Sequence, residues 1–191
     1  MNVIIIGCGG FGKEVLDLLS STEHTVMGFI DNKVIKDTKI NGTAVIGTDD
    51  DLKTLLKEVE GAVIAVANPT IRKNLFFKVK SLGYKLISLV HPSAVVSKNA
   101  QVGDGSIIYP GVTINTGVKI GLGCLINSNV SIGHDTQIGD FVNLNPGVNL
   151  GGKINIEEGC YIGIGANVIE NISIGQNTVI GGGAVVIESM P

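Results

Sequence analysis

Residues 120–138 read IGLGCLINSNVSIGHDTQI and show the pattern that decides the fold. An aliphatic residue stands at every sixth position, without insertion or deletion, from residue 90 to residue 186. A second small or apolar residue follows each of them four places later, as at Cys124 and Val130. The aliphatic positions are Val90, Val96, Val102, Ile108, Ile114, Ile120, Ile126, Ile132, Ile138, Leu144, Leu150, Ile156, Ile162, Val168, Ile174, Ile180 and Val186.

A six-residue unit is too short to bury its own apolar face, so successive units must stack and share one core. This predicts a parallel β-helix in which three hexads make one coil. An α-helix is excluded because a period of six does not follow a 3.6-residue face and because β-branched residues dominate. Glycines at the corners are expected to supply φ values that bulkier residues avoid, namely Gly103, Gly121, Gly133, Gly139 and Gly163.

The composition predicts a globular protein with a well-supplied core. The chain has 191 residues, 44% of them hydrophobic, and a mean hydropathy of +0.39. It contains no apolar run long enough to span a membrane, and its first residues lack the features of a signal peptide, so we expect a cytoplasmic location. The net charge of −3 and the scattered Lys and Arg residues argue against nucleic-acid binding.

The three cysteines are expected to be reduced. Cys124 and Cys160 are separated by two full coils of the expected β-helix. Stacked strands lie about 4.8 Å apart, so the two sulfur atoms should be roughly 10 Å apart in one column, too far for a disulfide. Cys8 lies in a glycine-rich loop, where a packing role is favoured over a nucleophilic one.

The first part of the chain predicts a strand, a glycine loop and a helix, over residues 2–6, 7–12 and 13–20. The loop fits the G-x-G-x-x-G pattern, in which bare amides and a helix N-terminus can cradle a phosphate. A second strand over residues 25–30 ends at Asp31 and Asn32, which should lie beside the loop. Asp31 could accept a hydrogen bond from a ribose hydroxyl or from a base.

The remaining residues before the hexads hold only a small βαβ unit with additions. We expect strands over 44–46, 62–67 and 85–89 and helices over 49–57 and 70–81. This is too short for the two halves of an NAD-binding domain, so a nucleotide or nucleotide sugar is favoured over NAD. A purely structural glycine turn stays open as the alternative.

The sequence therefore predicts two domains: an α/β, Rossmann-like nucleotide-sugar-binding domain over residues 1–89, and an all-β domain of hexapeptide repeats over residues 90–191. The change falls at Val90-His91-Pro92, where helical periodicity stops. His91, next to a proline, is expected to be a turn or capping residue.

His134 is the candidate for chemistry within the repeats, because it stands at a corner and should point outward. Gly152 occupies the equivalent place one coil further on and should lie beside it. An imidazole next to a bare amide suits acyl transfer, with a base for the nucleophile and a donor for the oxyanion. Asp135 could hold the imidazole tautomer, or it could form only a surface ion pair with Lys153, which is also one coil further on. The lone histidine makes a metal site unexpected.

Four motifs, GCGGFGKEVLDLL, FID, LVHPSA and IGHD, together resemble bacterial sugar acyltransferases of the sialic acid O-acetyltransferase and nucleotide-aminosugar N-acetyltransferase family. The resemblance covers the whole chain. It implies that the β-helix is left-handed and that the protein is a homotrimer with active sites between subunits. It also implies that acetyl-CoA lies between neighbouring β-helices, while the N-terminal domain holds the nucleotide of the sugar.

The resemblance also implies roles for single residues. His134 matches the general base, Asp135 its acidic neighbour, and Gly152 the amide that faces the thioester oxygen. The other matches are Asn127 in the active site, Ile164 and Gly182 along the pantetheine of CoA, and Gly10, Phe11 and Gly12 at the phosphates. Asp31 and Asn32 match residues near the base of the nucleotide. The aminosugar enzymes often have histidine where this chain has Phe11 and Asn143.

The expected function is transfer of an acetyl group from acetyl-CoA to the 4-amino group of a nucleotide-linked aminosugar, with UDP favoured, for surface glycan biosynthesis. O-acetylation of sialic acid is the alternative within the class, and a non-catalytic trimeric scaffold is the alternative outside it. The sugar, the base, the acyl chain and a CoA-binding tail after Pro191 stay open.

Overall fold

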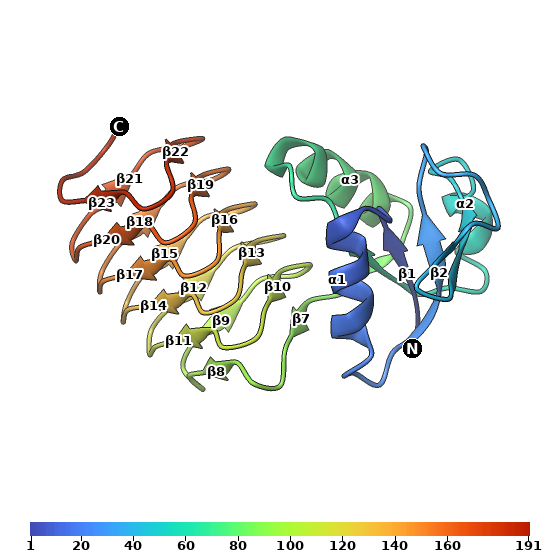
Figure 1. Ribbon diagram of the computed structural model, residues 1–191, viewed down its shortest axis with the longest axis horizontal. Coiled ribbons are helices and arrows are strands. Elements are labelled where there is room, and N and C mark those ends of the chain that lie inside the picture. The colour runs from blue at the N-terminus through green and yellow to red at the C-terminus, as the bar shows by residue number, and fades with distance from the viewer. The chain divides into compact units, whose positions relative to one another are not determined.

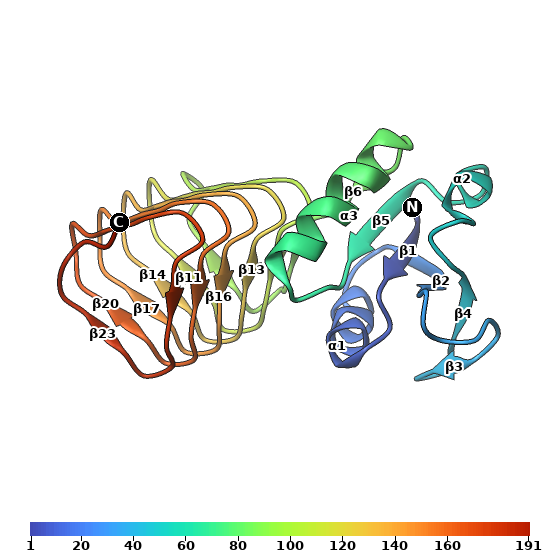
Figure 2. The same cartoon turned by 90° about the horizontal axis from the view of Figure 1, so that it is seen from above.

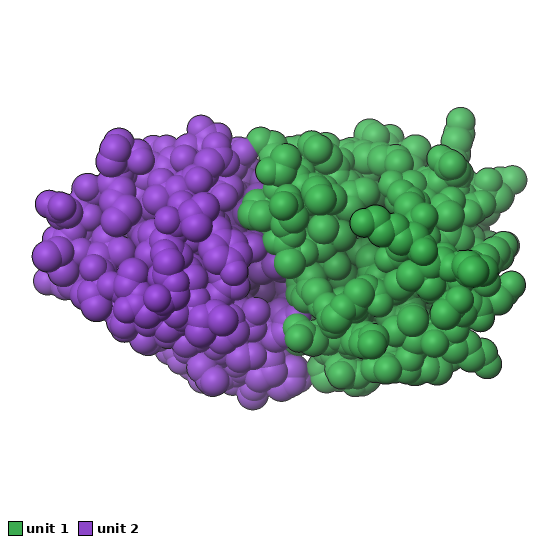
Figure 3. Space-filling view, turned by 45° about the horizontal axis from the view of Figure 1, so that its top comes forward, with its two compact units in different colours: residues 1–87 green, residues 88–191 purple.

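The computed structural model describes residues 1–191 and divides the chain into two compact units, residues 1–87 and 88–191 (Figure 3). The division falls slightly before the boundary expected from the sequence. The reason is that strand β7 (Leu89–Val90), expected to end the first domain, pairs instead with β10 of the β-helix, with Leu89 opposite Ile107.

The first unit is built on a six-stranded sheet in the order β3-β4-β2-β1-β5-β6, with α1 and α3 on opposite faces (Figure 2). The sheet is parallel except for β3. The order reverses at β1, whose neighbours are β2 and β5, and ligands of open α/β sheets bind outside the carboxyl ends of strands at such a point. The elements are β1 (Asn2–Ile6), α1 (Gly10–Leu19), β2 (Thr25–Ile30), β3 (Lys39–Ile40), β4 (Thr43–Gly47), α2 (Leu52–Leu55), β5 (Gly61–Ile64), α3 (Pro69–Ser81) and β6 (Lys85–Leu86).

Two predicted helices in this unit were wrong in extent, and one strand was missed. Helix α1 begins at Gly10, so the glycine loop supplies the first turn of the helix, and the helix expected over residues 49–57 is the short α2. Strand β3 was not expected at all. It forms a two-residue hairpin with β4 through Asn41 and Gly42, whose φ values of 46° and 85° are those of the turn that Asn-Gly pairs favour.

The second unit is a parallel β-helix of two-residue strands (Figure 1). Each strand pairs in parallel with the strand three hexads away, as Ile114 does with Ile132 and Ile132 with Leu150. This confirms that three hexads make one coil. The further strands are β8 (Val95–Val96), β9 (Gln101–Val102), β10 (Ile107–Ile108), β11 (Thr113–Ile114), β12 (Lys119–Ile120), β13 (Leu125–Ile126), β14 (Ser131–Ile132), β15 (Gln137–Ile138), β16 (Asn143–Leu144), β17 (Asn149–Leu150), β18 (Asn155–Ile156), β19 (Tyr161–Ile162), β20 (Asn167–Val168), β21 (Ser173–Ile174), β22 (Val179–Ile180) and β23 (Val185–Val186).

The three faces of the β-helix are three parallel sheets. Their strand orders are β22-β19-β16-β13-β10-β7, β23-β20-β17-β14-β11-β8 and β21-β18-β15-β12-β9. For the description of the site we call them the first, second and third face, in this order. The chain therefore turns a corner from the first face to the second, and another from the second to the third, in every coil.

The aliphatic residues at every sixth position fill the interior, and all of them from Ile108 to Val186 are buried. Val90, in the first coil, is 43% exposed, because a terminal coil has a neighbour on one side only. Cys124 and Cys160 are buried free thiols, as predicted, and they donate to the carbonyl groups of Gly139 and Gly175.

The reason given for the corner glycines was wrong. Positive φ occurs at the third residue after each aliphatic position from Val102 to Ile180, as at Gly165 and Asn129, whereas Gly133 and Gly163 stand at the first and have no positive φ. A Cβ at Gly163 would lie 2.5 Å from the nitrogen of Gly182, on the next coil. Gly103, Gly121, Gly133, Gly139 and Gly163 are therefore needed because successive coils approach each other closely there, and not for turn conformation.

None of the three helices combines the length and the apolar character that a bilayer-spanning segment needs.

Candidate active site

His134 lies at the corner between β14 and β15, and its side chain is 58% exposed. Its Nδ1 atom is 3.0 Å from Oδ2 of Asp135. The other carboxylate oxygen of Asp135 lies against Gly117 on the preceding coil, and the amide of Asp135 donates to the carbonyl of Thr116 at 3.0 Å. Asp135 is thus fixed from both sides. It can accept the proton of Nδ1, which leaves Nε2 of His134 with the lone pair of a base.

Gly152 lies beside the imidazole on the next coil, as the spacing of the repeat predicted. A Cβ at Gly152 would be 2.7 Å from Nε2 and 2.9 Å from Cε1 of His134. Glycine therefore makes room for the ring. The N–H group of Gly152 donates no hydrogen bond within the chain, whereas the amides of Gly151 and Lys153 on either side of it do. The corner brings a base and a free donor together.

The alternative ion pair between Asp135 and Lys153 is not formed. Asp135 pairs with His134, and Lys153 contacts this corner through its backbone, whose N–H group donates to the carbonyl of His134 at 2.8 Å. His134 is thus held from the next coil and Asp135 from the preceding one.

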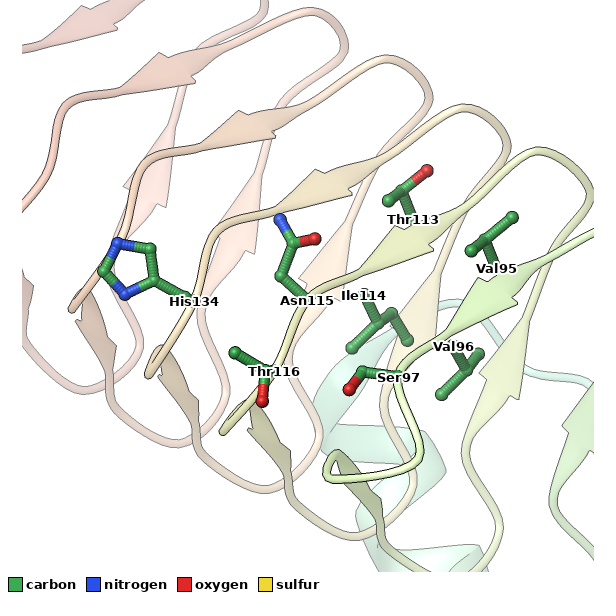
Figure 4. Close-up of a pocket in the computed structure, with 8 residues that line it drawn as sticks. All are labelled: Val95, Val96, Ser97, Thr113, Ile114, Asn115, Thr116 and His134. Carbon is green, nitrogen blue, oxygen red and sulfur yellow. The ribbon is translucent and has the colours of Figure 1, made fainter.

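His134 borders two hollows in the surface of the β-helix. The larger, of about 510 Å³, lies over the preceding coils on the second face and is lined in part by Thr113, Asn115 and Thr116 (Figure 4). The smaller, of about 210 Å³, is lined by His134, Gly152, Lys153, Glu170 and Asn171. The larger has the size of a small-molecule site, and its lining mixes apolar side chains with a few hydroxyl and amide groups.

Asn127, Ile164 and Gly182 lie on a different corner, from the first face to the second. They follow β13, β19 and β22, whereas His134 and Gly152 follow β14 and β17. Ile164 is 63% exposed, and its carbonyl oxygen would be 3.2 Å from a Cβ at Gly182, so these two residues are neighbours. Asn127 uses its Oδ1 atom to accept the amide of Ser128 at 2.8 Å. Within one chain, Asn127, Ile164 and Gly182 therefore lie on another corner of the β-helix than His134 and Gly152 do.

The glycine loop of the first unit is shaped by two of its glycines. Gly7 has a φ of 99°, and a Cβ there would be 2.7 Å from the carbonyl oxygen of Ala65, while a Cβ at Gly12 would run into the carbonyl of Gly7. Gly9 and Gly10 face open space and leave their backbone accessible at the start of α1. Phe11 is half-buried on the first turn of the helix.

Asp31 supports this loop. Its Oδ2 accepts from the amide of Cys8 at 3.0 Å and from the thiol of Cys8 at 3.2 Å, and its Oδ1 accepts from the amide of Lys33 at 2.8 Å. Burial disfavours the charged carboxylate, but these donors outweigh it and hold the pKa of Asp31 below its ordinary value. Burial and the contact with Asp31 raise the pKa of Cys8 to about 11, which makes it a poor nucleophile.

Asn32 and His91 also have structural partners. Oδ1 of Asn32 accepts from the amide of Asp49 at 2.9 Å, and the Asp49 carboxylate pairs with Lys78. That Asp31 and Asn32 lie near the base of a bound nucleotide stays a prediction.

His91 closes a turn, as expected, since its Nδ1 is 2.8 Å from the hydroxyl of Ser93.

Comparison with known proteins places both units in a family. Residues 2–79 match the model of the PglD N-terminal domain. The chain is 33% identical to PerB from Caulobacter crescentus, a structure in complex with CoA and GDP-perosamine, with a TM-score of 0.95 over 100% of this chain and 91% of that one. The chain belongs to the hexapeptide-repeat sugar acetyltransferase family.

Two further members of this sugar acetyltransferase family are similar. The acetyltransferase domain of PglB from Neisseria gonorrhoeae FA1090, in complex with acetyl coenzyme A, is 32% identical, with a TM-score of 0.93 over 100% of this chain and 92% of that one. UDP-N-acetylbacillosamine N-acetyltransferase of Bacillus subtilis (strain 168) is 36% identical over 109 residues, which are 56% of this chain. The matched part spans 50% of that curated relative. The expected fold class, with a left-handed β-helix after a Rossmann-like domain, is confirmed.

Several residues that border His134 were missed in the sequence. Thr116 and Glu170 stand in the same column as His134 and Gly152, one coil before and one coil after them. Both could have been found from the sequence, because each lies 18 residues, one coil, from His134 or Gly152. Thr113 and Asn115 have no such signal, because small polar residues stand at many outward positions of the repeats.

Proposed function

We propose that the protein transfers the acetyl group of acetyl-CoA to the 4-amino group of a nucleotide-linked aminosugar, with His134 as the general base. The observation that carries this proposal is the corner itself. Nδ1 of His134 is bonded to Asp135, and Nε2 lies against Gly152, whose N–H group is free. The names of the relatives, perosamine and UDP-N-acetylbacillosamine N-acetyltransferases, support an amine rather than a hydroxyl acceptor.

The proposed reaction is a direct transfer. The carbonyl oxygen of the thioester accepts a hydrogen bond from Gly152 N–H, and the neutral amine attacks the carbonyl carbon. As the C–N bond forms, Nε2 of His134 takes a proton from the nitrogen. The C–S bond then breaks, and the proton passes to the sulfur of CoA. The products are an N-acetylated sugar and the thiol of CoA, so no acyl-enzyme is needed.

We also propose that the working enzyme is a homotrimer whose sites lie between subunits. Ile164 and Gly182, assigned to the pantetheine, lie on another corner than His134 within one chain. If both corners serve one site, they come from neighbouring copies. The three free cysteines fit a reducing, cytoplasmic location.

The decisive experiment measures thiol release from acetyl-CoA with UDP- and GDP-linked 4-aminosugars, sialic acid and its CMP form. Turnover with a 4-aminosugar is expected. The nucleotide of the preferred substrate, UDP or GDP, shows which nucleotide base the protein recognises. Turnover with sialic acid alone would make the enzyme an O-acetyltransferase. A ligand at 100 times its Kd stabilises a protein by about 2.7 kcal/mol, so failure of CoA and every nucleotide to raise the Tm would favour a scaffold.

Substitution of His134 tests the base. His134→Ala should lower kcat by about 10²–10⁴-fold, which is the usual contribution of general-base catalysis. The Tm should stay near that of the wild type, because the side chain is 58% exposed. Near-full turnover of the variant would exclude His134 as the base.

A further inference from the structure

Lys153 has an unusual backbone conformation for a lysine. Its φ is 57°, and it occupies the third position after an aliphatic residue, where glycine is the most frequent residue in this β-helix. Side chains with a Cβ disfavour this conformation, and Asn and Asp tolerate it best. The residues other than glycine that have a positive φ at the equivalent positions are Asn129, Asp135, Phe141, Lys153, Asn171 and Asn177. Lys153 is the only cation among them, at a position whose backbone conformation does not favour it.

The ammonium group of Lys153 has no ion-pair partner in the chain. The carboxylates nearest in the repeat are Asp135, at the equivalent position of the preceding coil, and Glu170, on the following coil. Asp135 is bonded to Nδ1 of His134 and lies against Gly117, turned toward the coil before it. Neither carboxylate forms a salt bridge with Lys153, so its charge is available.

Lys153 and the proposed reacting groups, His134 and Gly152, line the same small hollow. Its volume is about 210 Å³. In a nucleotide-linked pyranose, the diphosphate is bonded to C1 and the reacting amine to C4, across the ring. The phosphates are therefore remote from Nε2 of His134 during transfer. The negative charge that does arise beside Gly152 is that of the thioester oxygen as the carbon becomes tetrahedral.

We propose that the ammonium group of Lys153 donates to this oxygen together with the N–H group of Gly152. This rests on the acyl transfer proposed above and adds a second donor to it. A cation next to the developing oxyanion stabilises the transition state more than the bound thioester, whose oxygen is nearly neutral. The loss of this donor should therefore lower kcat and leave the KM of both substrates nearly unchanged.

The test compares Lys153→Asn, Lys153→Arg and a control, Lys119→Asn. Asparagine stands at the equivalent corners 129, 171 and 177, so Lys153→Asn removes the charge at a position where asparagine fits the backbone. Lys119 is exposed on β12 and borders neither hollow. We expect Lys153→Asn to lower kcat by about 10- to 100-fold, below the loss typical of a fully buried oxyanion donor. Lys153→Arg should recover part of the rate, and Lys119→Asn should match the wild type.

Thiol release is measured with the aminosugar and also without any acceptor, when water attacks the thioester. Both reactions pass through the same oxyanion, so Lys153→Asn should slow both. Failure of every aminosugar to accelerate thiol release would refute the proposed acceptor, while a slower hydrolysis in Lys153→Asn would still support the donor. A Lys153→Asn enzyme that keeps kcat within about twofold, or changes only a KM, would overturn the role of Lys153. A Tm lowered as much in Lys153→Asn as in a variant of a buried residue such as Ile132→Val would also overturn it, since the residue would then be structural.

Discussion

The geometry of single residues at the His134 corner depends on a contact between successive coils. The imidazole lies against Gly152, which belongs to the following coil, and Asp135 lies against Gly117, which belongs to the preceding one. Each functional group is therefore positioned by a coil other than its own. Such positioning by rigid backbone is what an exposed histidine needs to act as a base in a fixed place.

Gly152→Ala tests this contact directly. The new Cβ would meet Nε2 of His134 at 2.7 Å, and an exposed side chain can move aside without disturbing the fold. We expect kcat to fall by at least about tenfold while the Tm changes little, because His134, the proposed base, leaves its position. In a background of His134→Ala the same change should cost little more, since the two variants remove one function. Additive losses would show that Gly152 acts independently of His134.

Asp31 is the residue that connects the end of β2 to the glycine loop. Its folded pKa is lowered from 3.8, so the charged carboxylate stabilises the fold. This stability is fully present above about pH 5 and is lost as the pH falls below 3.8, through the folded pKa. Asp31→Asn should therefore unfold more easily in urea at pH 7, by about 1 kcal/mol, and the difference should shrink as the pH falls below 3.8 and through the folded pKa of Asp31. A difference that stays constant with pH would mean that the charge of Asp31 is irrelevant.

At the scale of elements, glycine serves the β-helix in two separable ways. At Gly133 a Cβ would run into the backbone of Gly151, although φ is ordinary. At Gly165 there is open space, but φ is +67°. The first kind of glycine permits close stacking, and the second permits the turn.

Substitution by asparagine separates these two roles. Gly133→Ala and Gly133→Asn should both destabilise the fold by about 1–3 kcal/mol, because any Cβ forces two coils apart. Gly165→Ala should cost about 1 kcal/mol, and Gly165→Asn less, because asparagine accepts the left-handed conformation. Urea unfolding measures all four variants. Equal costs for alanine and asparagine at residue 165 would contradict the assignment.

Much of this second unit could be predicted because its repeat has a fixed length. Once three hexads make a coil, the position of Gly152 beside His134 follows by addition. The same addition would have placed Ile164 on another corner than His134, a step that the resemblance alone did not supply. The partners of Asp31 could not be predicted, since they depend on how a loop closes against the end of a strand. The missed hairpin at Asn41-Gly42, in contrast, had a readable signal.

For the whole molecule, the distribution of the candidate residues over two corners leads to a test with mixed subunits. His134→Ala and Asn127→Ala should each be inactive or nearly so. In the proposed trimer, assembled from both variants, some sites would combine the intact His134 of one copy with the intact Asn127 of its neighbour. With random assembly at equal amounts, about one quarter of the sites should regain activity.

The mixture is prepared by refolding or by co-expression and assayed for thiol release, with the separate variants as controls. Recovery of activity supports a site shared between subunits. No recovery, with mixed trimers confirmed by mass spectrometry, would place both residues in one subunit's site. A monomer in light scattering would exclude the shared site altogether.

The pairing of each strand with its counterpart on the adjacent coil also limits how such a protein can change in size. Insertion of one residue within a two-residue strand would break the pairing of that strand, while insertion of a whole coil would preserve every pair. The β-helix can therefore grow or shrink only in increments of one coil, each about 4.8 Å in height. The distance between the coil of His134 and the coil of Ile164 can therefore change only in steps of one coil height. The length of an extended ligand that spans these coils would have to change in the same steps.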